Sequence, residues 1–251
     1  MNDIAPLSRI RVVLAQPSHP GNIGAAARAM KTMGLDRLYL VRPLRFPDPQ
    51  ARAMSANALD VLERAVICAT LDEALAGTAI QIAFSARTRE LSHPALDARA
   101  AAAEAIDCAA AQEAALVFGS EDAGLANEEV LRCNRLAHIP ADPSCSSLNL
   151  AAAVQVAAYE IRLAALARRA PGAHCAAVPE LARHEDVENF YVHLEQSLIA
   201  SGFLNPRYPR RLMERLRRLF SRTQLEKDEV SILRGMLSRW DSRRRPDGDN
   251  S

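Results

Sequence analysis

Short apolar runs alternate with helical segments over the first 165 residues, and this alternation limits the fold more than any other feature of the chain. Strands are predicted at five runs rich in branched aliphatic side chains, at residues 10–15, 37–41, 79–84, 115–118 and 136–139. Helices are predicted between and after them, at residues 22–33, 56–65, 71–76, 96–111, 127–133 and 147–168. Repeated strand–helix units predict an α/β fold, with a parallel sheet covered by helices on both faces.

The chain changes character after this region. Residues 169–182 carry two prolines and a glycine, which is typical of a linker. Further helices are predicted beyond it, at residues 187–201, 209–222 and 226–242. We therefore expect an α/β domain at residues 1–168, a linker at residues 169–182 and a small helical extension at residues 183–251.

The two ends of the chain differ in charge, although the formal net charge is only +1. Residues 1–165 carry 15 Lys or Arg against 18 Asp or Glu, whereas residues 205–245 carry 13 against 5. On a helix from Pro209, four arginines would share one face, namely Arg211, Arg215, Arg218 and Arg222. Such a face is either merely solvated or binds a polyanion, and the scarcity of acidic partners nearby favours contact with an RNA backbone.

Cysteine and histidine usage gives little sign of a metal site. None of the five cysteines stands in a C-x-x-C pair, so we expect free thiols in a reducing compartment. Most of the six histidines are predicted to be structural or surface residues, and His19 alone lies in a candidate ligand loop. The first residues lack the apolar core of a signal peptide, and no run of about 18 apolar residues is present. We expect a cytoplasmic protein that has no membrane segment and binds no metal.

Ligands of parallel α/β sheets gather where the strands end, and three such loops are rich in small and polar residues. In the first, residues 16–24, Gly21 and Gly24 allow tight turns. An ordinary strand-to-helix turn that binds no ligand could contain the same residues. Nicotinamide binding is disfavoured, because G-x-G-x-x-G is incomplete and Arg42 stands where an acidic residue would end the second strand.

The second loop, residues 118–125, fits neither the G-x-S-x-G nucleophile turn nor a phosphate-binding P-loop. Its Glu121 could serve a ligand site or simply lie at the start of a helix. The third loop, residues 139–150, precedes the long alanine-rich helix. Ser146 or Ser147 as an N-cap would explain one serine without any function, but a long polar loop here could also wrap a ligand.

Taken together and in this order, the three loops resemble the motifs of the SPOUT methyltransferases, and within them the branch of tRNA ribose methyltransferases called TrmJ. The first motif is similar to residues 22–30 (NIGAAARAM), the second to residues 118–121 (FGSE) and the third to residues 146–151 (SSLNLA). The segments 190–195, 216–220 and 232–235 are similar to the C-terminal extension typical of that branch.

The resemblance implies a trefoil knot in the α/β domain, a homodimer and S-adenosylmethionine as methyl donor, with S-adenosylhomocysteine as the product. It assigns the donor pocket to residues that are mostly small: Phe84, Ser85, Ala86, Gly119, Ile139, Ser146, Ser147 and Leu148. It also implies a catalytic set made of Arg28, Ser147 and Asn149, with Asn22 and Glu121 as supporting residues.

The implied reaction is 2′-O-methylation of ribose in the anticodon loop of tRNA, at cytidine or uridine 32. The ribose hydroxyl would attack the donor methyl group in line, which requires positioning more than a metal. Arg28 is a poor base because a guanidinium stays protonated, so we expect it to grip a phosphate and polarise the hydroxyl. Two alternatives are a ribosomal RNA methyltransferase of the same superfamily and a catalytically silent RNA-binding relative.

Overall fold

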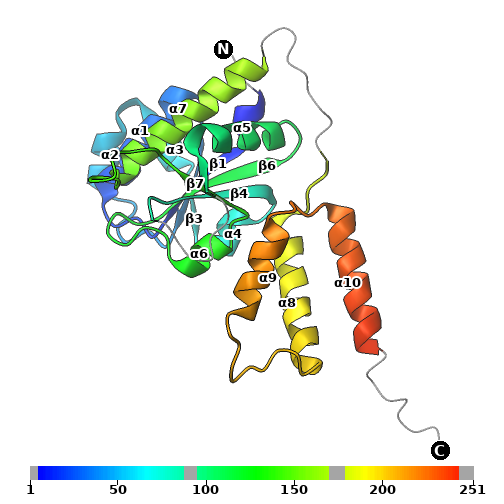
Figure 1. Cartoon of the computed structure of the whole chain (residues 1–251). Helices are drawn as coiled ribbons and strands as arrows, with labels where there is room; N and C mark the ends of the chain where they lie inside the picture. The colour runs from blue at the N-terminus through cyan, green and yellow to red at the C-terminus, as the bar shows by residue number, and fades with distance from the viewer. Residues whose placement is uncertain (1–4, 88–94, 170–178, 243–251) are drawn as a thin grey trace, which may run out of the picture.

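The computed structural model describes residues 5–87, 95–169 and 179–242, and a seven-stranded sheet forms its centre (Figure 1). The strands are β1 (Ile10–Ala15), β2 (Arg37–Val41), β3 (Val66–Cys68), β4 (Thr78–Phe84), β5 (Ala95–Asp97), β6 (Glu113–Phe118) and β7 (Arg135–His138). They lie in the order β3-β2-β1-β6-β4-β7-β5, and every pairing is parallel. The predicted parallel α/β fold is confirmed.

Helices cover both faces of this sheet. One layer contains α1 (Pro20–Met33), α2 (Pro49–Ser55), α3 (Leu59–Glu63), α5 (Ala98–Ala109) and α7 (Leu150–Arg168). The other contains α4 (Leu71–Leu75) and α6 (Asn127–Leu131). Alternate residues of β1 enter opposite cores, with Val12 and Leu14 facing the first layer and Val13 and Ala15 the second. This two-sided burial is the reason why the strands are apolar runs.

Several short elements differ from the sequence prediction. The strands β3 and β5 were not predicted, and each has only three residues. The helix predicted at residues 56–65 is shortened to α3, because residues 56–58 form a 3-10 turn in which Ala56 has a φ of 46°. The helix α2, which precedes this turn, was not predicted. The N-cap position of α6 is Ala126 rather than Asn127, although asparagine is the better capping residue.

The start of α7 also corrects the sequence prediction. The helix begins at Leu150, and the N-cap is Asn149, whose side chain accepts hydrogen bonds from the backbone N–H of Ala151 and Ala152. Neither Ser146 nor Ser147 caps it, so capping does not account for these serines. By length and composition alone α7 could cross a membrane, but one face of it packs in the core against α1 and α5.

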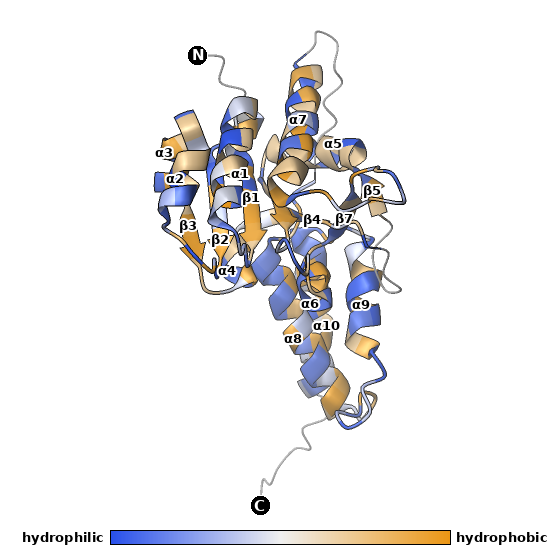
Figure 2. Ribbon diagram, turned by 90° about the vertical axis from the view of Figure 1, so that its left-hand side faces the viewer, coloured by the Kyte–Doolittle hydropathy of each residue, from blue (hydrophilic) through white to orange (hydrophobic). Residues whose placement is uncertain are grey.

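Three further helices form a separate small core, and they extend away from the sheet (Figures 1 and 2). They are α8 (His184–Ala200), α9 (Leu212–Ser221) and α10 (Lys227–Ser242). Phe190 and Tyr191 of α8 pack against Phe220 of α9, and Val230 and Leu237 of α10 complete the cluster. The second helix begins at Leu212 rather than at Pro209, which leaves Arg211 as its N-cap.

The helical part contacts the edge of the sheet where the strands begin. Gln112, which precedes β6, exchanges two hydrogen bonds with the backbone of Leu181. Gly77, which precedes β4, donates its N–H to Glu185 of α8 at 2.8 Å. Leu181 and Ala182 are buried, so the end of the expected linker belongs to this contact.

The described cysteines are not joined by disulfides. Cys68, Cys108 and Cys133 are buried, and Cys145 is exposed. Cys175, His93 and His174 lie outside the described residues. The trefoil knot remains a prediction.

Candidate functional site

The loops that follow β4, β6 and β7 enclose a pocket of about 330 Å³ where these strands end. All eight residues expected to hold the methyl donor line it: Phe84, Ser85, Ala86, Gly119, Ile139, Ser146, Ser147 and Leu148. They come from three segments that are far apart in sequence but meet because their strands are neighbours in a parallel sheet. Glu121 also lines the pocket.

Two aromatic rings and one glycine give the pocket its shape. The rings of Phe84 and Phe118 stack with centroids 4.8 Å apart, at the ends of β4 and β6. At Gly119 a Cβ atom would lie 2.1 Å from the backbone carbon of Gly124, so no other residue fits there without moving the loop. An apolar floor, small side chains and exposed backbone suit a small polar ligand held by main-chain hydrogen bonds, as S-adenosylmethionine would be.

Glu121 ties the loop after β6 to the loop after β1, residues 16–24, which lies beside the pocket without lining it. Its carboxylate accepts hydrogen bonds from the backbone N–H of Ser18 at 2.8 Å, from the Ser18 hydroxyl at 2.9 Å and from the Asn22 amide at 2.8 Å. The backbone N–H of His19 adds a fourth at 3.2 Å. Burial alone would raise the pKa of Glu121, but the hydrogen bonds from Ser18 and Asn22 outweigh it and hold the pKa below its ordinary value. The group is therefore an anchored carboxylate and a poor proton carrier.

Asn149 joins the third loop to the same network. Its Nδ2 donates to Oδ1 of Asn22 at 3.0 Å, while its own Oδ1 caps α7. One chain of hydrogen bonds thus joins the loops that follow β1, β6 and β7, and it runs through Asn22, Glu121 and Asn149. Because both ends of the Asn149 amide are engaged, the geometry indicates a positioning role for this residue rather than a direct chemical one.

Arg28 lies apart from this cluster. It is exposed on α1, does not line the pocket and makes no hydrogen bond or ion pair with residues 5–87, 95–169 or 179–242. Ser147 is exposed within the pocket wall. The structure of a single chain therefore brings together four of the five expected catalytic or supporting residues and leaves the arginine outside.

The pocket contains residues that the sequence analysis did not assign to the donor site. Phe118, Leu125, Leu150 and Ala153 add apolar surface, and Arg87 and Asp122 add charge. Phe118 could have been found, because it ends its strand as Phe84 does and precedes the motif glycine. In the described part of the chain, no three His, Cys, Asp or Glu side chains are grouped as metal ligands.

The four arginines expected to bind RNA are only partly brought together. Arg215, Arg218 and Arg222 line an open groove along α9 with Leu216 and Leu219. Arg218 is half-buried, and its Nε has no hydrogen-bond partner within the described residues. Arg211 lies outside this groove and forms an ion pair with Glu214 at 2.7 Å.

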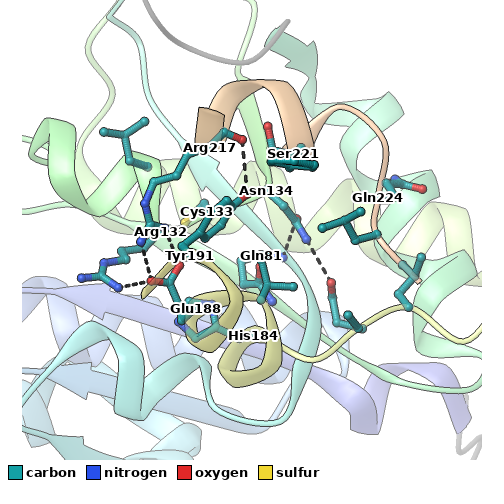
Figure 3. Close-up of a pocket in the computed structure, with 17 residues that line it drawn as sticks. Gln81, Arg132, Cys133, Asn134, His184, Glu188, Tyr191, Arg217, Ser221 and Gln224 are labelled. Carbon is teal, nitrogen blue, oxygen red and sulfur yellow. Dashed lines mark hydrogen bonds and ion pairs between the residues drawn. The ribbon is translucent and has the colours of Figure 1, made fainter. Parts of the chain in front are cut away.

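A cluster of ion pairs fixes α9 relative to the α/β part (Figure 3). Glu188 of α8 accepts two hydrogen bonds from the Arg217 guanidinium, at 2.5 and 2.7 Å, and also pairs with Arg132, which follows α6. The Arg217 guanidinium lies over the Tyr191 ring, 4.3 Å from its centroid. His184 contacts Asp72 of α4 at 3.0 Å, and this hydrogen bond is the main reason why the pKa of Asp72 lies below its ordinary value. The donor pocket and this contact thus lie at opposite edges of the sheet.

Comparison with known proteins identifies both parts of the chain. Residues 9–159 match the SpoU rRNA methylase family, and residues 185–249 match the C-terminal domain of tRNA methyltransferase TrmJ. The chain is 48% identical over 243 residues to the tRNA (cytidine/uridine-2′-O-)-methyltransferase TrmJ of Cronobacter sakazakii, covering 95% of this chain and 98% of that protein. It is 49% identical to the tRNA (cytidine/uridine/adenosine-2′-O-)-methyltransferase TrmJ of Pseudomonas aeruginosa, covering 92% and 93% respectively.

Solved structures agree with this family match. The crystal structure of TrmJ from Z. mobilis superposes with a TM-score of 0.80 at 31% identity, covering 92% of this chain and 98% of that one. A structure concerned with 2′-OH methylation of C/U34 on tRNA has a TM-score of 0.53 at 30% identity, and covers 65% of this chain but 99% of its own. The SpoU methyltransferase AviRb of Streptomyces viridochromogenes, in complex with AdoMet, has a TM-score of 0.51 at 25% identity, covering 62% and 60%.

Proposed function

The chain belongs to the SpoU methylase family, and we propose that it transfers a methyl group from S-adenosylmethionine to the ribose 2′-hydroxyl of cytidine or uridine 32 in tRNA. It is a tRNA 2′-O-methyltransferase, as its relatives of about 49% identity are. One observation carries the proposal most directly: a pocket lined by the second and third motif loops, which Glu121 ties to the first, stands in the same chain as the helical domain of the tRNA branch.

The alternatives have less support. A ribosomal RNA substrate does not explain why residues 185–249 match a domain of a tRNA methyltransferase. A silent RNA-binding relative would have no need of the hydrogen-bonded network at Glu121 or of the close backbone approach between Gly119 and Gly124 beside the pocket. The pocket residues and their network therefore support the proposal of a working donor site.

The donor supplies an activated methyl group, and the residues of this chain would bind it and orient the acceptor. Phe84, Phe118 and Gly119 would hold it, and the network of Asn22, Glu121 and Asn149 would keep the three loops in register. Ser147 lies in the wall where a hydroxyl could orient the ribose. Arg28 would grip the phosphate beside the target ribose and polarise the 2′-hydroxyl, because its guanidinium binds phosphate in a bidentate manner.

Arg28 does not line the pocket of its own chain, and the helical part contacts the far edge of the sheet, so we include a homodimer in the proposal. In one chain the helical part contacts the edge where strands begin, about 20 Å from the pocket along β4. A surface for the second copy is available on α7, where three apolar side chains three or four residues apart are exposed: Tyr159, Leu163 and Leu166. Leu163→Glu should therefore convert the dimer to monomers in sedimentation analysis; an unchanged mass would place the contact elsewhere.

The proposal also includes the division of the chain into an α/β domain at residues 1–168 and a helical extension at residues 183–251. The helices α8, α9 and α10 have their own core, and the RNA-facing arginines lie on them. The match to the solved C/U34 methylation structure covers 99% of that chain but only 65% of this one, so about a third of this chain is unmatched. We therefore assign tRNA binding, and the choice between positions 32 and 34, to the helical extension.

The decisive test is methylation of unmodified tRNA transcripts with labelled S-adenosylmethionine, followed by mapping of the modified nucleoside by mass spectrometry. We expect 2′-O-methylcytidine or 2′-O-methyluridine at position 32. A transcript with a 2′-deoxy nucleotide at that position is the control and should accept nothing. Methylation at position 34 would contradict the assigned position, and methylation of ribosomal RNA alone would contradict the assigned substrate.

A further inference from the structure

The loop between α8 and α9, residues 201–211, exposes two aromatic side chains far from the donor pocket. Phe203 is 73% exposed and Tyr208 is 72% exposed. Large apolar side chains that stay in water over a basic surface are a feature of proteins that bind single-stranded nucleic acid. No residue of this loop lines the donor pocket or the arginine groove of α9. Arg215 of α9 borders both the arginine groove and the groove next to this loop.

The loop is held in a defined shape. Leu204 is buried, and its N–H donates to the carbonyl of Leu198 at 3.0 Å. Asn205 accepts from the backbone N–H of Arg207 with its side chain at 2.9 Å, and its carbonyl accepts from the N–H of Tyr208 at 3.0 Å. The two aromatic side chains are thus carried on a fixed backbone, which lowers the entropy lost when a ligand stacks on them.

A groove of about 420 Å³ runs between the aromatic side chains and the start of α9. Its walls include Phe203, Tyr208, Leu212, Arg210 and Arg215. The volume falls in the range of roughly 300–1,000 Å³ that small-molecule sites occupy.

The charge around the groove is uncompensated. The side chains of Arg207, Arg210 and Arg215 form no ion pair or hydrogen bond with residues 5–87, 95–169 or 179–242. Arg210 and Arg211 both have left-handed backbone, with φ values of 46° and 56°, a conformation that costs energy for side chains of this size and that concentrates at functional sites. Three free guanidinium groups beside two aromatic side chains match a phosphate backbone together with a base.

We propose that this groove is a second RNA site, in which an unpaired nucleobase of the tRNA stacks on Tyr208 or Phe203 while Arg210 and Arg215 hold the neighbouring phosphates. The inference rests on the proposed function for the identity of the RNA. A paired base is excluded as the ligand, because its faces are covered by its neighbours in an A-form helix. The groove therefore selects single-stranded RNA, whereas the arginines of α9 can hold either form.

The nucleotide in this groove is different from the one that is methylated by the same chain. The loop lies at the end of α8 farthest from the sheet (Figure 1), and the 17 residues of that helix span about 25 Å. The helices contact the edge of the sheet where the strands begin, and the donor pocket lies at the other edge, where the strands end. The site would thus grip an unpaired part of the substrate other than the nucleotide in the donor pocket of the same chain, and would add affinity.

The test compares a fluorescently labelled ten-nucleotide oligouridylate, an RNA duplex of ten base pairs and an unmodified tRNA transcript, each titrated with the full-length protein. Tyr208→Ala and Phe203→Ala remove one ring each, and Tyr208→Phe keeps the ring. Ile232→Ala, an apolar side chain of α10 that is 62% exposed, is the matched control. Donor affinity and melting temperature are recorded for every variant as a check of the fold.

We expect each alanine variant to bind the oligouridylate about tenfold more weakly, with less than a twofold change for the duplex and for the control variant. Tyr208→Phe should bind like the wild type. The slope of log K against log salt should stay the same for Tyr208→Ala and fall by about 0.7 for Arg210→Gln, since only the arginine neutralises a phosphate. Tyr208→Trp on a Trp240→Phe background should show fluorescence quenching that saturates with oligouridylate.

Equal losses for duplex and single strand, or no loss for either, would overturn the inference. A changed oligomeric state in the Phe203→Ala, Tyr208→Ala double variant would show instead that the groove is a contact between copies of the chain. Methyl transfer to tRNA by the wild-type protein is measured in the same series. If it occurs while the alanine variants bind normally, the second site fails and the proposed function stands; if it does not occur, the proposed function itself fails.

Discussion

Arg28 and Glu121 both belong to the expected catalytic set, but their surroundings differ. Glu121 is held by hydrogen bonds from two loops, so its carboxylate cannot turn toward a substrate without breaking them. Arg28 has no such restraint in the described part of its own chain and is exposed on α1. At the scale of single residues, Glu121 stabilises the loops of the site, and Arg28 is available to bind a charged partner.

The role proposed for Arg28 is tested by Arg28→Lys. Lysine keeps the charge but loses the planar pair of donors, so kcat should fall by about a hundredfold or more while the donor binds as before. Single-turnover kinetics with tRNA and calorimetric titration of the donor would measure the two quantities. Wild-type turnover in this variant would remove Arg28 from the mechanism.

The carboxylate of Glu121 should stabilise the folded protein in a pH-dependent way. Because its pKa in the folded state is lowered, the contribution is fully present above the ordinary value of 4.5 and is lost as pH falls through the lower folded value. Glu121→Gln should lower the melting temperature at pH 7 by roughly 2–6 °C. The gap between variant and wild type should narrow below pH 4.5, and a gap independent of pH would show that charge plays no part.

At the scale of elements, the sequence predicted the long strands and helices because each buries a continuous apolar run or stripe. It missed β3 and β5, since three residues are too few to show a period, and β3 is a partly exposed edge strand. It also placed the start of α7 at Ser147, because serine and asparagine are similar caps and only the hydrogen bonds of Asn149 decide between them.

The donor-site residues could be named from the sequence because they lie in loops with a recognisable order of small and polar residues. Their network could not, because Glu121 meets Asn22 across 99 positions and Asn149 meets Asn22 across 127. The contacts of Glu188 are equally long-range, and no local pattern of charge reveals which arginine it meets. Pairings of this kind depend on the sheet order, which the sequence alone left open.

Glu188 joins α8, α9 and the end of α6, so its loss should loosen the helical part. Glu188→Ala leaves Arg217, which is 17% exposed, without its main partner and should destabilise the protein by about 3 kcal/mol. Arg99→Ala is the control, since it breaks a pair with Glu160 at a side chain that is 79% exposed and should cost less than about 1 kcal/mol. Chemical denaturation gives both values, and hydrogen exchange should show faster exchange in α8 and α9. Equal costs in the two variants would show that Glu188 is no more than a surface ion pair.

At the scale of the whole molecule, the proposed donor pocket and the helices proposed to bind RNA lie at opposite edges of one sheet. Within a single subunit, the helices would bind the tRNA at one edge of the sheet while the methyl donor lay at the other edge. Two subunits related by a twofold axis solve this problem if each supplies Arg28 and its helices to the pocket of its partner. The exposed apolar face of α7 gives such a pair a surface on which to form.

This arrangement predicts rescue between two inactive variants. Arg28→Lys keeps its pocket, and Gly119→Ala keeps its arginine but cannot form the pocket, because the added Cβ would meet the Gly124 backbone. In a mixed dimer both defects then fall on the same site and the other site is intact. Unfolding and refolding the two variants together in equal amounts should restore about a quarter of wild-type activity, since half of the dimers are mixed and each has one working site. If Arg28 instead acts within its own chain, each defect disables a different site and the mixture stays as inactive as its components.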